Sequence, residues 1–536
     1  MSRREVWLAF VLVAALTLGV GVRGRLVERR VDWDGLAAVA HANDVFRAEP
    51  AANLAMIGFV QPPLPALLQL PVVLLAPGLA TSGLAAALQG AIAAGIAAAL
   101  LLGLAAEAGL GRGWRWPLVA AFALHPLVLG PASMGAPQAL LTALLLGASW
   151  ALMRWSRTDS LRDLIAASVV LAAALITRYE AVFIVVGAML YLGWRTRRAS
   201  GSWSRLEGTM ITFALPVVYV AGIWIIANWA IIGDPWYFAR EAFTLVPAGL
   251  DEMLTASLRV ALVACFPVLA LIYNQMRGAT RSPAPARAAA WLVLTAMLAP
   301  AIFPGVFAGV AEDGDWGRLV TVTAMALAGG FAMIAVLGGE AVAGRSRGPM
   351  QGTVVMIAAS LGLVIFLGTQ GAGLPGPFAD AYWGRGPLSD SAAPELTAAE
   401  QLRRSDLPAG SRHIVVGWPG FAVVLFAGKT GEITAIRAED LRREWGRLWV
   451  GSRVVLLAGR EGLETPQSVP ISMMTELKPL WQAGPWRCYE VVRAGPATGS
   501  RQPGTGDGQP ATGNRQPATG DGQPATGSRQ PATGDG

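Results

Sequence analysis

Two aspartates, Asp32 and Asp34, lie in the first polar stretch of an otherwise apolar chain, where they could act in acid–base chemistry. Asp34 opens a segment of small residues with helical spacing, from Gly35 to Asn43. A carboxylate at such a helix start, with little bulk around it, is well placed to take a proton from a hydroxyl group. Asp is also a favoured N-cap residue, so a helix cap is the alternative interpretation of Asp34. Asp32 is the reserve candidate for the base, or a hydrogen-bond partner of Asp34.

Two further charged motifs interrupt apolar segments, and each contains an arginine. Arg178 and Glu180 stand between two apolar runs with almost no polar residues beside them. Snorkelling at a membrane boundary fits Glu180 less well than Arg178, because an anion gains nothing from anionic head groups. An Arg–Glu pair beside a phosphate or sugar site would explain both residues. Arg318 begins another apolar run, and a fork-shaped cation there suits a phosphate leaving group.

Other polar positions complete the set of candidate site residues. Gln61 precedes two prolines, and Asp234 lies in a Gly-Asp-Pro-Trp turn signal whose aromatic residues are typical of the membrane interface. Asp313 and Asp315 could hold a divalent cation through oxygen ligands, although acidic caps are common on outer loops. The three histidines and two cysteines have no metal-ligand spacing. The sequence therefore predicts no His or Cys metal site, and it predicts free thiols.

The composition indicates that these residues belong to a membrane protein. Of the 536 residues, 54% are hydrophobic and 14% are charged, whereas soluble domains contain about 25% charged residues. The net charge of +7 comes from arginines in short clusters between apolar runs. That is the positive-inside pattern of proteins in a lipid bilayer, rather than a stripe that tracks nucleic-acid phosphates. No nucleic-acid partner is expected.

Eleven apolar runs are candidates for membrane spans, which need roughly 20 apolar residues. The first run has no small-residue cleavage site after it, so an uncleaved signal anchor is expected. Residues 64–77 are apolar but short and broken by prolines, which predicts a juxtamembrane or re-entrant helix outside the span count. The predicted spans lie near 5–22, 83–106, 117–133, 137–153, 162–177, 181–194, 208–231, 258–274, 288–308, 318–338 and 352–369.

The arginine-rich loops determine the sidedness of these spans. With Met1 in the cytoplasm, five basic loops fall on the cytoplasmic side, as the excess of Lys and Arg in inner loops requires. Arg23 to Arg30 lie on the outer side in this topology and could face lipid phosphates. The candidate site residues also fall outside, and the bias toward Arg, Ala and Gly suggests a bacterial cytoplasmic (inner) membrane. The five inner loops are 112–115, 154–162, 195–205, 277–287 and 345–347.

Five segments are expected along the chain. Residues 1–22 form the signal-anchor transmembrane helix, 23–82 the first extracytoplasmic loop with juxtamembrane helices, and 83–369 the bundle of transmembrane helices. Residues 370–495 alternate short apolar stretches with a charged, helix-compatible segment, which predicts a small extracytoplasmic α/β or α+β domain. Residues 496–536 repeat Gln-Pro-Ala-Thr-Gly without apolar positions, so a disordered tail is expected.

Taken in order over residues 1–370, these motifs resemble the C-type (GT-C) glycosyltransferases, polytopic membrane enzymes that use polyprenyl-phosphate sugars. The subgroup is that of protein mannosyltransferases and lipid A aminoarabinose transferases. Gly35 follows Asp34 where the family commonly has Glu. The similar elements are Gln61-Pro62-Pro63-Leu64 for the family's His-Pro-Pro-Leu, 175–180 for its Thr-Arg-x-Glu hairpin, 228–235 for its Asn…Gly-Asp-Pro segment, and 317–319 for its Gly-Arg-Tyr.

The resemblance implies a glycosyltransferase of the hexosyltransferase type that moves a sugar from a polyprenyl-phosphate donor to a protein, lipid or glycan acceptor at the outer face. Asp34, or Asp32, would deprotonate the acceptor hydroxyl, and a single in-line displacement would invert the anomeric carbon. The leaving phosphate is anionic and needs charge stabilisation, which an arginine or a possible divalent cation could supply. The residues implied to bind the donor and its phosphate are Gln61, Arg178, Glu180, Asp234 and Arg318.

Two other classes remain alternatives. A non-catalytic cell-envelope scaffold or assembly protein would use the outer domain and the tail as its binding parts. A transporter is the third class, and transporters usually carry ionisable residues in mid-span and have repeated halves. The spans of this chain are mainly Ala, Leu, Val and Gly, with charges at their ends, which favours the enzyme.

Overall fold

The computed structural model describes the N-terminal half of the chain and parts of the C-terminal region. Arg318, Asp313, Asp315 and the 496–536 tail lie outside the described residues, as do the predicted spans near 258–274, 288–308 and 352–369. The described residues are 2–47, 54–242, 321, 325, 327–332, 334–336, 390–405, 413–416, 420–428, 433–436, 453–457 and 477–492.

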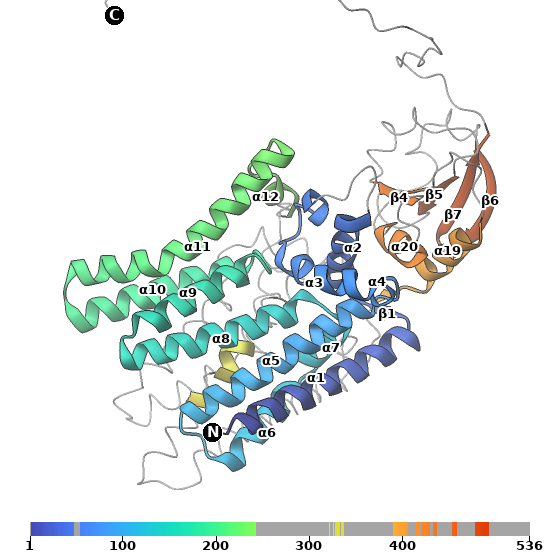
Figure 1. Ribbon diagram of the computed structural model, residues 1–536. Coiled ribbons are helices and arrows are strands. Elements are labelled where there is room, and N and C mark those ends of the chain that lie inside the picture. Colours follow the sequence, from blue (N-terminus) through green and yellow to red (C-terminus); the bar gives the residue numbers. More distant parts are fainter. Residues whose placement is uncertain are drawn as a thin grey trace, which may run out of the picture. The chain divides into compact units, whose positions relative to one another are not determined.

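Within the described residues, four helices are long and apolar enough to cross a membrane, with 24, 24, 22 and 30 residues. At about 1.5 Å per residue, each exceeds the ~30 Å hydrocarbon core of a bilayer. The chain is therefore a multi-pass membrane protein. Figure 1 shows the long helices running side by side. The four are α1 (Arg3–Leu26), α5 (Leu84–Glu107), α8 (Pro137–Thr158) and α11 (Trp203–Ile232).

Three of the other predicted spans are also helical. The run near 117–133 is broken into two helices that meet at an angle of 58°. Pro126 causes the break, because a proline disfavours helical backbone in the residue before it and lacks the N–H that would continue the helix. The pair is α6 (Arg112–Ala123) and α7 (Pro126–Met134), and the other two spans are α9 (Leu161–Leu175) and α10 (Ala181–Ser200).

The apolar run near 64–77 forms separate short helices, α3 (Leu64–Leu75) and α4 (Pro77–Thr81). The 12 residues of α3 extend over about 18 Å, which is too short to cross the bilayer, as the sequence predicts. The side chain of Gln69 is buried and donates a hydrogen bond of 3.1 Å to the carbonyl oxygen of Ala85, which fastens α3 to α5.

Glycines allow close packing of the first membrane helices. A Cβ at Gly21 of α1 would overlap the carbonyl oxygen of Ser133, and one at Gly90 of α5 would overlap that of Ala132. Both oxygens belong to α7, so α7 lies directly against the backbones of α1 and α5. Small residues permit such contact between membrane helices, where dispersion replaces the hydrophobic effect as the driving force.

The three described arginine loops lie at one end of the helices and are joined by ion pairs. Arg112 contacts Glu5 at 2.6 Å, which joins α6 to the start of α1. Further ion pairs there are Arg154–Asp163 at 3.4 Å and Arg195–Asp159 at 2.8 Å. This common end is the arrangement that the parity of the spans predicts.

The C-terminal elements form a mixed sheet with two helices beside it. The strand order is β4-β3-β5-β7-β6, in which β3 pairs in parallel with β4 and β5, and β7 pairs antiparallel with β5 and β6. The buried indole of Trp486 donates a 3.2 Å hydrogen bond to Glu395, which joins the sheet to α19. The elements are α19 (Ala393–Arg404), β3 (His413–Val416), α20 (Gly420–Ala427), β4 (Ile433–Ile436), β5 (Arg453–Leu457), β6 (Leu477–Ala483) and β7 (Trp486–Val491).

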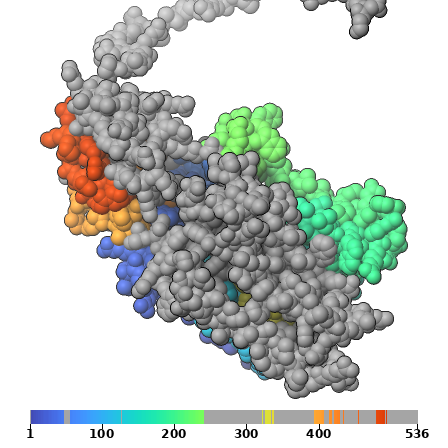
Figure 2. Space-filling view, turned by 180° about the vertical axis from the view of Figure 1, so that it is seen from behind, coloured from blue at the N-terminus to red at the C-terminus, as the bar shows by residue number. Residues whose placement is uncertain are grey.

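A two-stranded ladder connects these elements to the end of α1. Strand β1 (Arg30–Val31) pairs antiparallel with β2 (Asp390–Ser391). The buried Arg25 stacks over Phe426 of α20 at 4.5 Å and donates a 2.7 Å hydrogen bond to the carbonyl oxygen of Ser82. Arg25 therefore contacts protein, and the interpretation that it faces lipid phosphate is wrong. In Figure 2, the orange surface of the C-terminal elements adjoins the blue N-terminal surface.

The remaining described elements follow α1 and α11. They are α2 (Trp33–Arg47), the 3-10 helix η1 (Leu54–Ile57), and α12 (Tyr237–Ala242). The edge-to-face contact of Trp33 with Phe421, with ring centroids 6.2 Å apart, packs the start of α2 against α20. Helix α2 thus lies between the membrane helices and the C-terminal elements.

Gly21→Ala should destabilise the protein because its methyl group would force α1 away from α7. The expected loss is about 1–3 kcal/mol, as for other overpacked sites. Gly19→Ala is the matched control on the same helix, since a Cβ at Gly19 meets nothing within 4 Å. Thermal unfolding of the detergent-solubilised full chain measures both effects. Equal melting temperatures of the two variants would contradict the close contact of α1 with α7.

Candidate functional site at the start of helix α2

The N-cap of α2 is Asp32, not Asp34. The Asp32 side chain accepts a 2.7 Å hydrogen bond from the backbone N–H of Gly35, the third residue of the helix. That bond satisfies an N–H group that a helix start leaves without an intrahelical partner. The cap interpretation of Asp34 is therefore wrong, and its side chain is available for other contacts.

Close backbone packing explains why glycine follows Asp34. A Cβ at Gly35 would overlap the carbonyl oxygen of Gly135, which lies in the turn between α7 and α8. Gly135 itself has φ of +86°, a conformation that favours glycine. The start of α2 can approach this turn so closely only without a side chain at Gly35, and a Cβ at Gly135 would overlap Ala86 of α5.

Asp34 connects three segments that are distant in the sequence. Its Oδ2 accepts a 2.6 Å hydrogen bond from Nη1 of Arg178, and its Oδ1 accepts a 3.1 Å bond from the amide of Gln61. The first contact is charge-assisted, the stronger class of hydrogen bond. Three of the site residues predicted from the sequence therefore meet at one carboxylate.

Arg178 lies in the short turn between α9 and α10 and is mostly buried, with 12% of its side chain exposed. Its Nη2 and Nε donate to the hydroxyl of Thr321 at 2.9 and 3.2 Å. The amide of Gln138, at the start of α8, donates to the same hydroxyl at 3.3 Å. Glu180, the N-cap residue of α10, lies 3.9 Å from the guanidinium. The guanidinium is thus fixed in place by contacts on several sides.

Thr321 and Gln138 were not among the predicted site residues. Gln138 is an isolated amide directly after a proline in an apolar run, and Thr321 is an ordinary polar residue within another. Neither has a spacing that marks it as a partner of Arg178. A polar residue near the mouth of a predicted span is the only signal that could have indicated them.

The environment of Asp32 differs from that of Asp34. Burial raises the pKa of the Asp32 carboxyl to about 7, and the neighbouring charge of Asp34 adds to the increase. Asp32 therefore changes charge near neutral pH. Asp34 instead has a guanidinium at 2.6 Å to compensate a negative charge.

The Asp34 side chain lines a small pocket. Ala38 and His41 of α2 line it too, because positions 34, 38 and 41 fall on one face of a helix. Gln61, Thr177 and Arg178 complete its polar lining, together with apolar and proline side chains. His41 was not predicted as a site residue, although its seven-residue spacing from Asp34 could have indicated it.

His41 contributes a neutral imidazole to the pocket. Burial lowers the pKa of His41, while a hydrogen bond with the backbone of Met56 acts in the opposite direction. Its ring lies beneath Gly58, where a Cβ would come within 3.0 Å of two ring atoms. A neutral imidazole can both donate and accept a hydrogen bond, which suits the hydroxyl groups of a sugar.

Asp234 is not part of the hydrogen-bond network around Asp34 in the described residues. It pairs with Arg240 and accepts a 3.0 Å hydrogen bond from the backbone of Trp236, so it stabilises the turn before α12. This segment nevertheless reaches the Arg178 turn, because the rings of Phe238 and Tyr179 lie 5.2 Å apart. The predicted role of Asp234 in binding the donor remains a prediction.

The described part of the chain contains no group of three or more His, Cys, Asp or Glu side chains that could hold a metal ion. Cys488 is a buried cysteine. The site thus offers a carboxylate, a guanidinium, a neutral amide and an imidazole around one pocket. These groups can take a proton from a hydroxyl and can bind a phosphate.

Comparison with solved structures identifies the fold. The crystal structure of ArnT from Cupriavidus metallidurans bound to undecaprenyl phosphate is similar over 92% of this chain and 100% of that chain, with a TM-score of 0.54 and 13% identity. The apo structure of ArnT gives a TM-score of 0.53 and 14% identity with the same coverage. No protein-family model matches the sequence, and a search of curated proteins found no significant match.

The chain has the same fold as ArnT, which agrees with the resemblance that the ordered motifs indicate. The prediction of a polytopic helical membrane protein is confirmed by the several apolar helices and the ArnT-like fold. The count of eleven spans includes segments outside the described residues.

Asp32→Asn should make stability less dependent on pH. Folding raises the pKa of Asp32 from about 3.8 to about 7, so the folded state favours the protonated carboxyl. The resulting contribution of Asp32 to the free energy of unfolding is fully present below pH 4 and is lost as pH rises through 7. The loss is at most about 4 kcal/mol. Asn is an equally good N-cap, so the variant keeps the hydrogen bond to Gly35 and removes only the charge.

Melting temperatures of the detergent-solubilised protein between pH 5 and 8 measure this effect. Burial also raises the pKa of Asp44 to about 7, so Asp32→Asn should flatten the pH profile in part. Glu207→Gln changes an exposed carboxyl of α11 and should keep the wild-type profile. An unchanged profile for Asp32→Asn would contradict the raised pKa of Asp32.

Proposed function

We propose that this protein is a membrane glycosyltransferase that moves a sugar from a polyprenyl-phosphate donor to an acceptor at the outer membrane face. The observation that carries the proposal is the contact of Asp34 with Arg178 in a pocket at one end of the membrane helices. The GT-C fold supports the class, and ArnT, which shares the fold, was solved with undecaprenyl phosphate. The enzyme is of the hexosyltransferase type.

Asp34 is the proposed general base. Each of its oxygens accepts one hydrogen bond, from Arg178 or from Gln61, and a carboxylate oxygen can accept two. An acceptor hydroxyl can therefore bind the same carboxylate without displacing either partner. Asp32 is the weaker candidate, because its side chain caps α2 and does not line the pocket.

Arg178 is the proposed stabiliser of the leaving phosphate. The acceptor oxygen forms a bond to the anomeric carbon, its proton passes to Asp34, and the bond from that carbon to the phosphate oxygen breaks. The phosphate keeps the electron pair and gains one negative charge, so fixed positive charge beside it lowers the barrier. A guanidinium held by Thr321 and Asp34 is preorganised for that task.

The other residues that the resemblance implies in donor binding are proposed to position Asp34 and Arg178 or to bind the donor. Gln61 is proposed to orient Asp34, and Glu180 to hold the guanidinium of Arg178. Asp234 and Arg318 are proposed to bind the donor as well, with Asp313 and Asp315 as ligands of a possible divalent cation. The short helix α3 borders the pocket through Pro65 and Ala66, which suits the first part of a lipid chain.

The proposed orientation follows from the charges at the two ends of the helices. The arginine loops would face the cytoplasm and the Asp34 pocket the outer side, as the excess of basic residues in inner loops requires. A bacterial inner membrane is the proposed location. Residues 370–495 are proposed to be an extracytoplasmic domain that shapes the acceptor site, since α20 packs on the start of α2.

Asp34→Asn should lower the rate of sugar transfer by about 10²–10⁴-fold, the usual contribution of a general base. The assay follows label transfer from radiolabelled polyprenyl-phosphate sugars in membranes that contain the full chain. Asp44→Asn is the matched control, because it removes a carboxylate from the same helix but outside the pocket lining. Asp32→Asn should retain most of the activity.

The results of this assay test the enzyme class and the choice of general base separately. Loss with Asp32→Asn but not with Asp34→Asn would keep the enzyme class and overturn the choice of base. No transfer from any donor by folded, inserted wild-type protein would overturn the enzyme and favour the non-catalytic scaffold.

A further inference from the structure

A second pocket lies at the arginine-rich end of the helices, between α8, α9, α10 and α11. Helix α8 starts beside the Arg178 network and ends beside this pocket, and its 22 residues separate the two sites by about 33 Å. The pocket holds about 730 Å³ of empty space, counting its open mouth. Its polar lining comprises Asp159, Arg195, Thr196, Arg205, Thr209 and Thr212.

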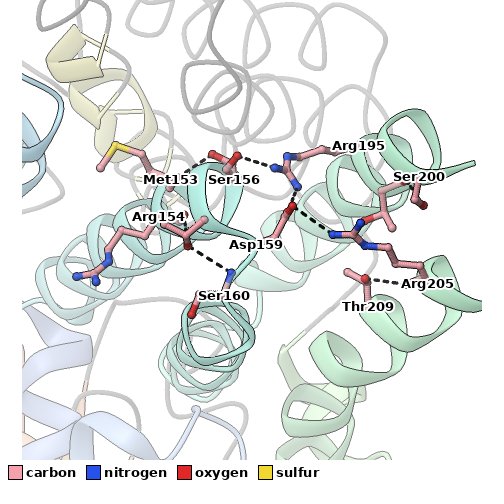
Figure 3. Close-up of polar contacts among 11 residues, drawn as sticks. Met153, Arg154, Ser156, Asp159, Ser160, Arg195, Ser200, Arg205 and Thr209 are labelled. Atoms are coloured by element: carbon pink, nitrogen blue, oxygen red, sulfur yellow. Dashed lines mark hydrogen bonds and ion pairs between the residues drawn. The ribbon is translucent and has the colours of Figure 1, made fainter.

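Two guanidinium groups meet at one carboxylate in this pocket (Figure 3). Asp159 follows α8 with a positive φ of 53°, and its Oδ1 accepts a 2.8 Å hydrogen bond from Arg195. Its Oδ2 lies 3.2 Å from Nη2 of Arg205. The hydrogen bond from Arg195 lowers the pKa of Asp159, so this carboxylate is ionised at neutral pH. Two cations and one anion leave a net positive charge at the pocket.

The two arginines differ in burial and in the number of their contacts. Arg195 is only 16% exposed, stacks on Trp155 at 4.3 Å, and donates a 2.5 Å hydrogen bond to the carbonyl oxygen of Ser156. Arg205 is 53% exposed, and within the described residues only its Nη2 is engaged. The pocket therefore combines one rigid cation with one whose remaining donors can reach a ligand.

Thr196 supplies a polar group that protein contacts leave unsatisfied. The residue is 3% exposed and lines the pocket, and its hydroxyl has no hydrogen-bond partner among the described residues. An unsatisfied buried hydroxyl costs about 1–3 kcal/mol. An oxygen of a bound ligand would satisfy it.

Tryptophans mark the level of the pocket in the membrane. Arg197 stacks over Trp203 at 4.3 Å, and Arg198 lies 5.6 Å from the ring of Trp194. Tryptophan and arginine side chains gather where head groups meet the hydrocarbon core. Apolar side chains continue from there along the exposed surface of the neighbouring helices, including Leu161, Ile165, Ile211 and Leu215.

We propose that this pocket binds the phosphate of an anionic phospholipid. Arg195 and Arg205 face the phosphate, the Thr196 hydroxyl donates to one of its oxygens, and the acyl chains lie along the apolar surfaces of α9 and α11. Basic pockets between membrane helices bind anionic head groups in other proteins. The net positive charge favours an anionic lipid over a zwitterionic one.

Native mass spectrometry of the delipidated full chain in a neutral detergent tests the proposal. The protein is titrated with phosphatidylglycerol, with phosphatidylcholine, and with phosphatidylglycerol in the presence of inorganic phosphate. The wild type should retain phosphatidylglycerol in preference to phosphatidylcholine. Arg205→Gln should lower the affinity for phosphatidylglycerol about five-fold, the value of one arginine near an anionic lipid.

Arg162→Gln is the matched control, since this exposed arginine of α9 lies at the same end but does not line the pocket. It should change the affinity by less than about two-fold. Thr196→Val keeps the shape of the side chain and should still weaken binding, so the test does not depend on an arginine variant that misfolds. Melting temperatures confirm that each variant is folded.

Three results would overturn the proposal. The first is equal retention of phosphatidylglycerol by Arg205→Gln and Arg162→Gln. The second is equal retention of phosphatidylcholine and phosphatidylglycerol by the wild type, which would indicate unselective lipid binding. The third is displacement of the lipid by millimolar inorganic phosphate, which would assign the pocket to free phosphate.

Discussion

The contact between Asp34 and Arg178 is the interaction on which the rest of the site depends. The two residues are 144 positions apart in the chain, and both are largely withdrawn from water. A charge in that setting must be paired, because leaving it alone costs several kcal/mol. The need to pair these charges brings α2 to the turn between α9 and α10, and the pocket forms where they meet.

Close backbone contacts and the C-terminal elements hold α2 in position for this pair. Gly35 rests on the backbone of Gly135, so the start of the helix cannot carry a larger residue there. On its other side, Trp33 packs against Phe421 of α20. A rigid helix start of this kind keeps the Asp34 carboxylate at a fixed distance from the guanidinium, which preorganisation for catalysis requires. The packing of α2 thus determines the position of the proposed general base.

The sequence predicts the architecture well where hydrophobicity and charge are the deciding forces. Apolar runs place the membrane helices, and the arginine loops gather at one end, as parity requires. The grouping of Gln61, Asp34 and Arg178 followed from the ordered motifs. These features depend on whether each segment is more stable in lipid or in water, and that preference can be estimated for each segment separately.

The sequence does not predict features that depend on tertiary contacts. The spacing leaves a helix cap as the alternative role of Asp34, whereas in the structure Asp32, two residues earlier, caps the helix. The partners of Arg178 at Thr321 and Gln138 come from distant segments and carry no local signal. The pocket at Asp159 requires four helices to pack before its arginines converge. Such contacts are decided by packing, which a single sequence does not encode in any short pattern.

The most direct test of this account is a cryo-EM structure of the full chain with bound polyprenyl phosphate, the product that the proposed reaction releases. If Arg178 stabilises the leaving phosphate, density for the phosphate should lie at the Asp34 pocket, with an oxygen within about 3 Å of the Arg178 guanidinium. The lipid chain should leave the pocket past α3. Phosphate density elsewhere, with the Asp34 pocket empty and the Asp34–Arg178 contact unchanged, would contradict it.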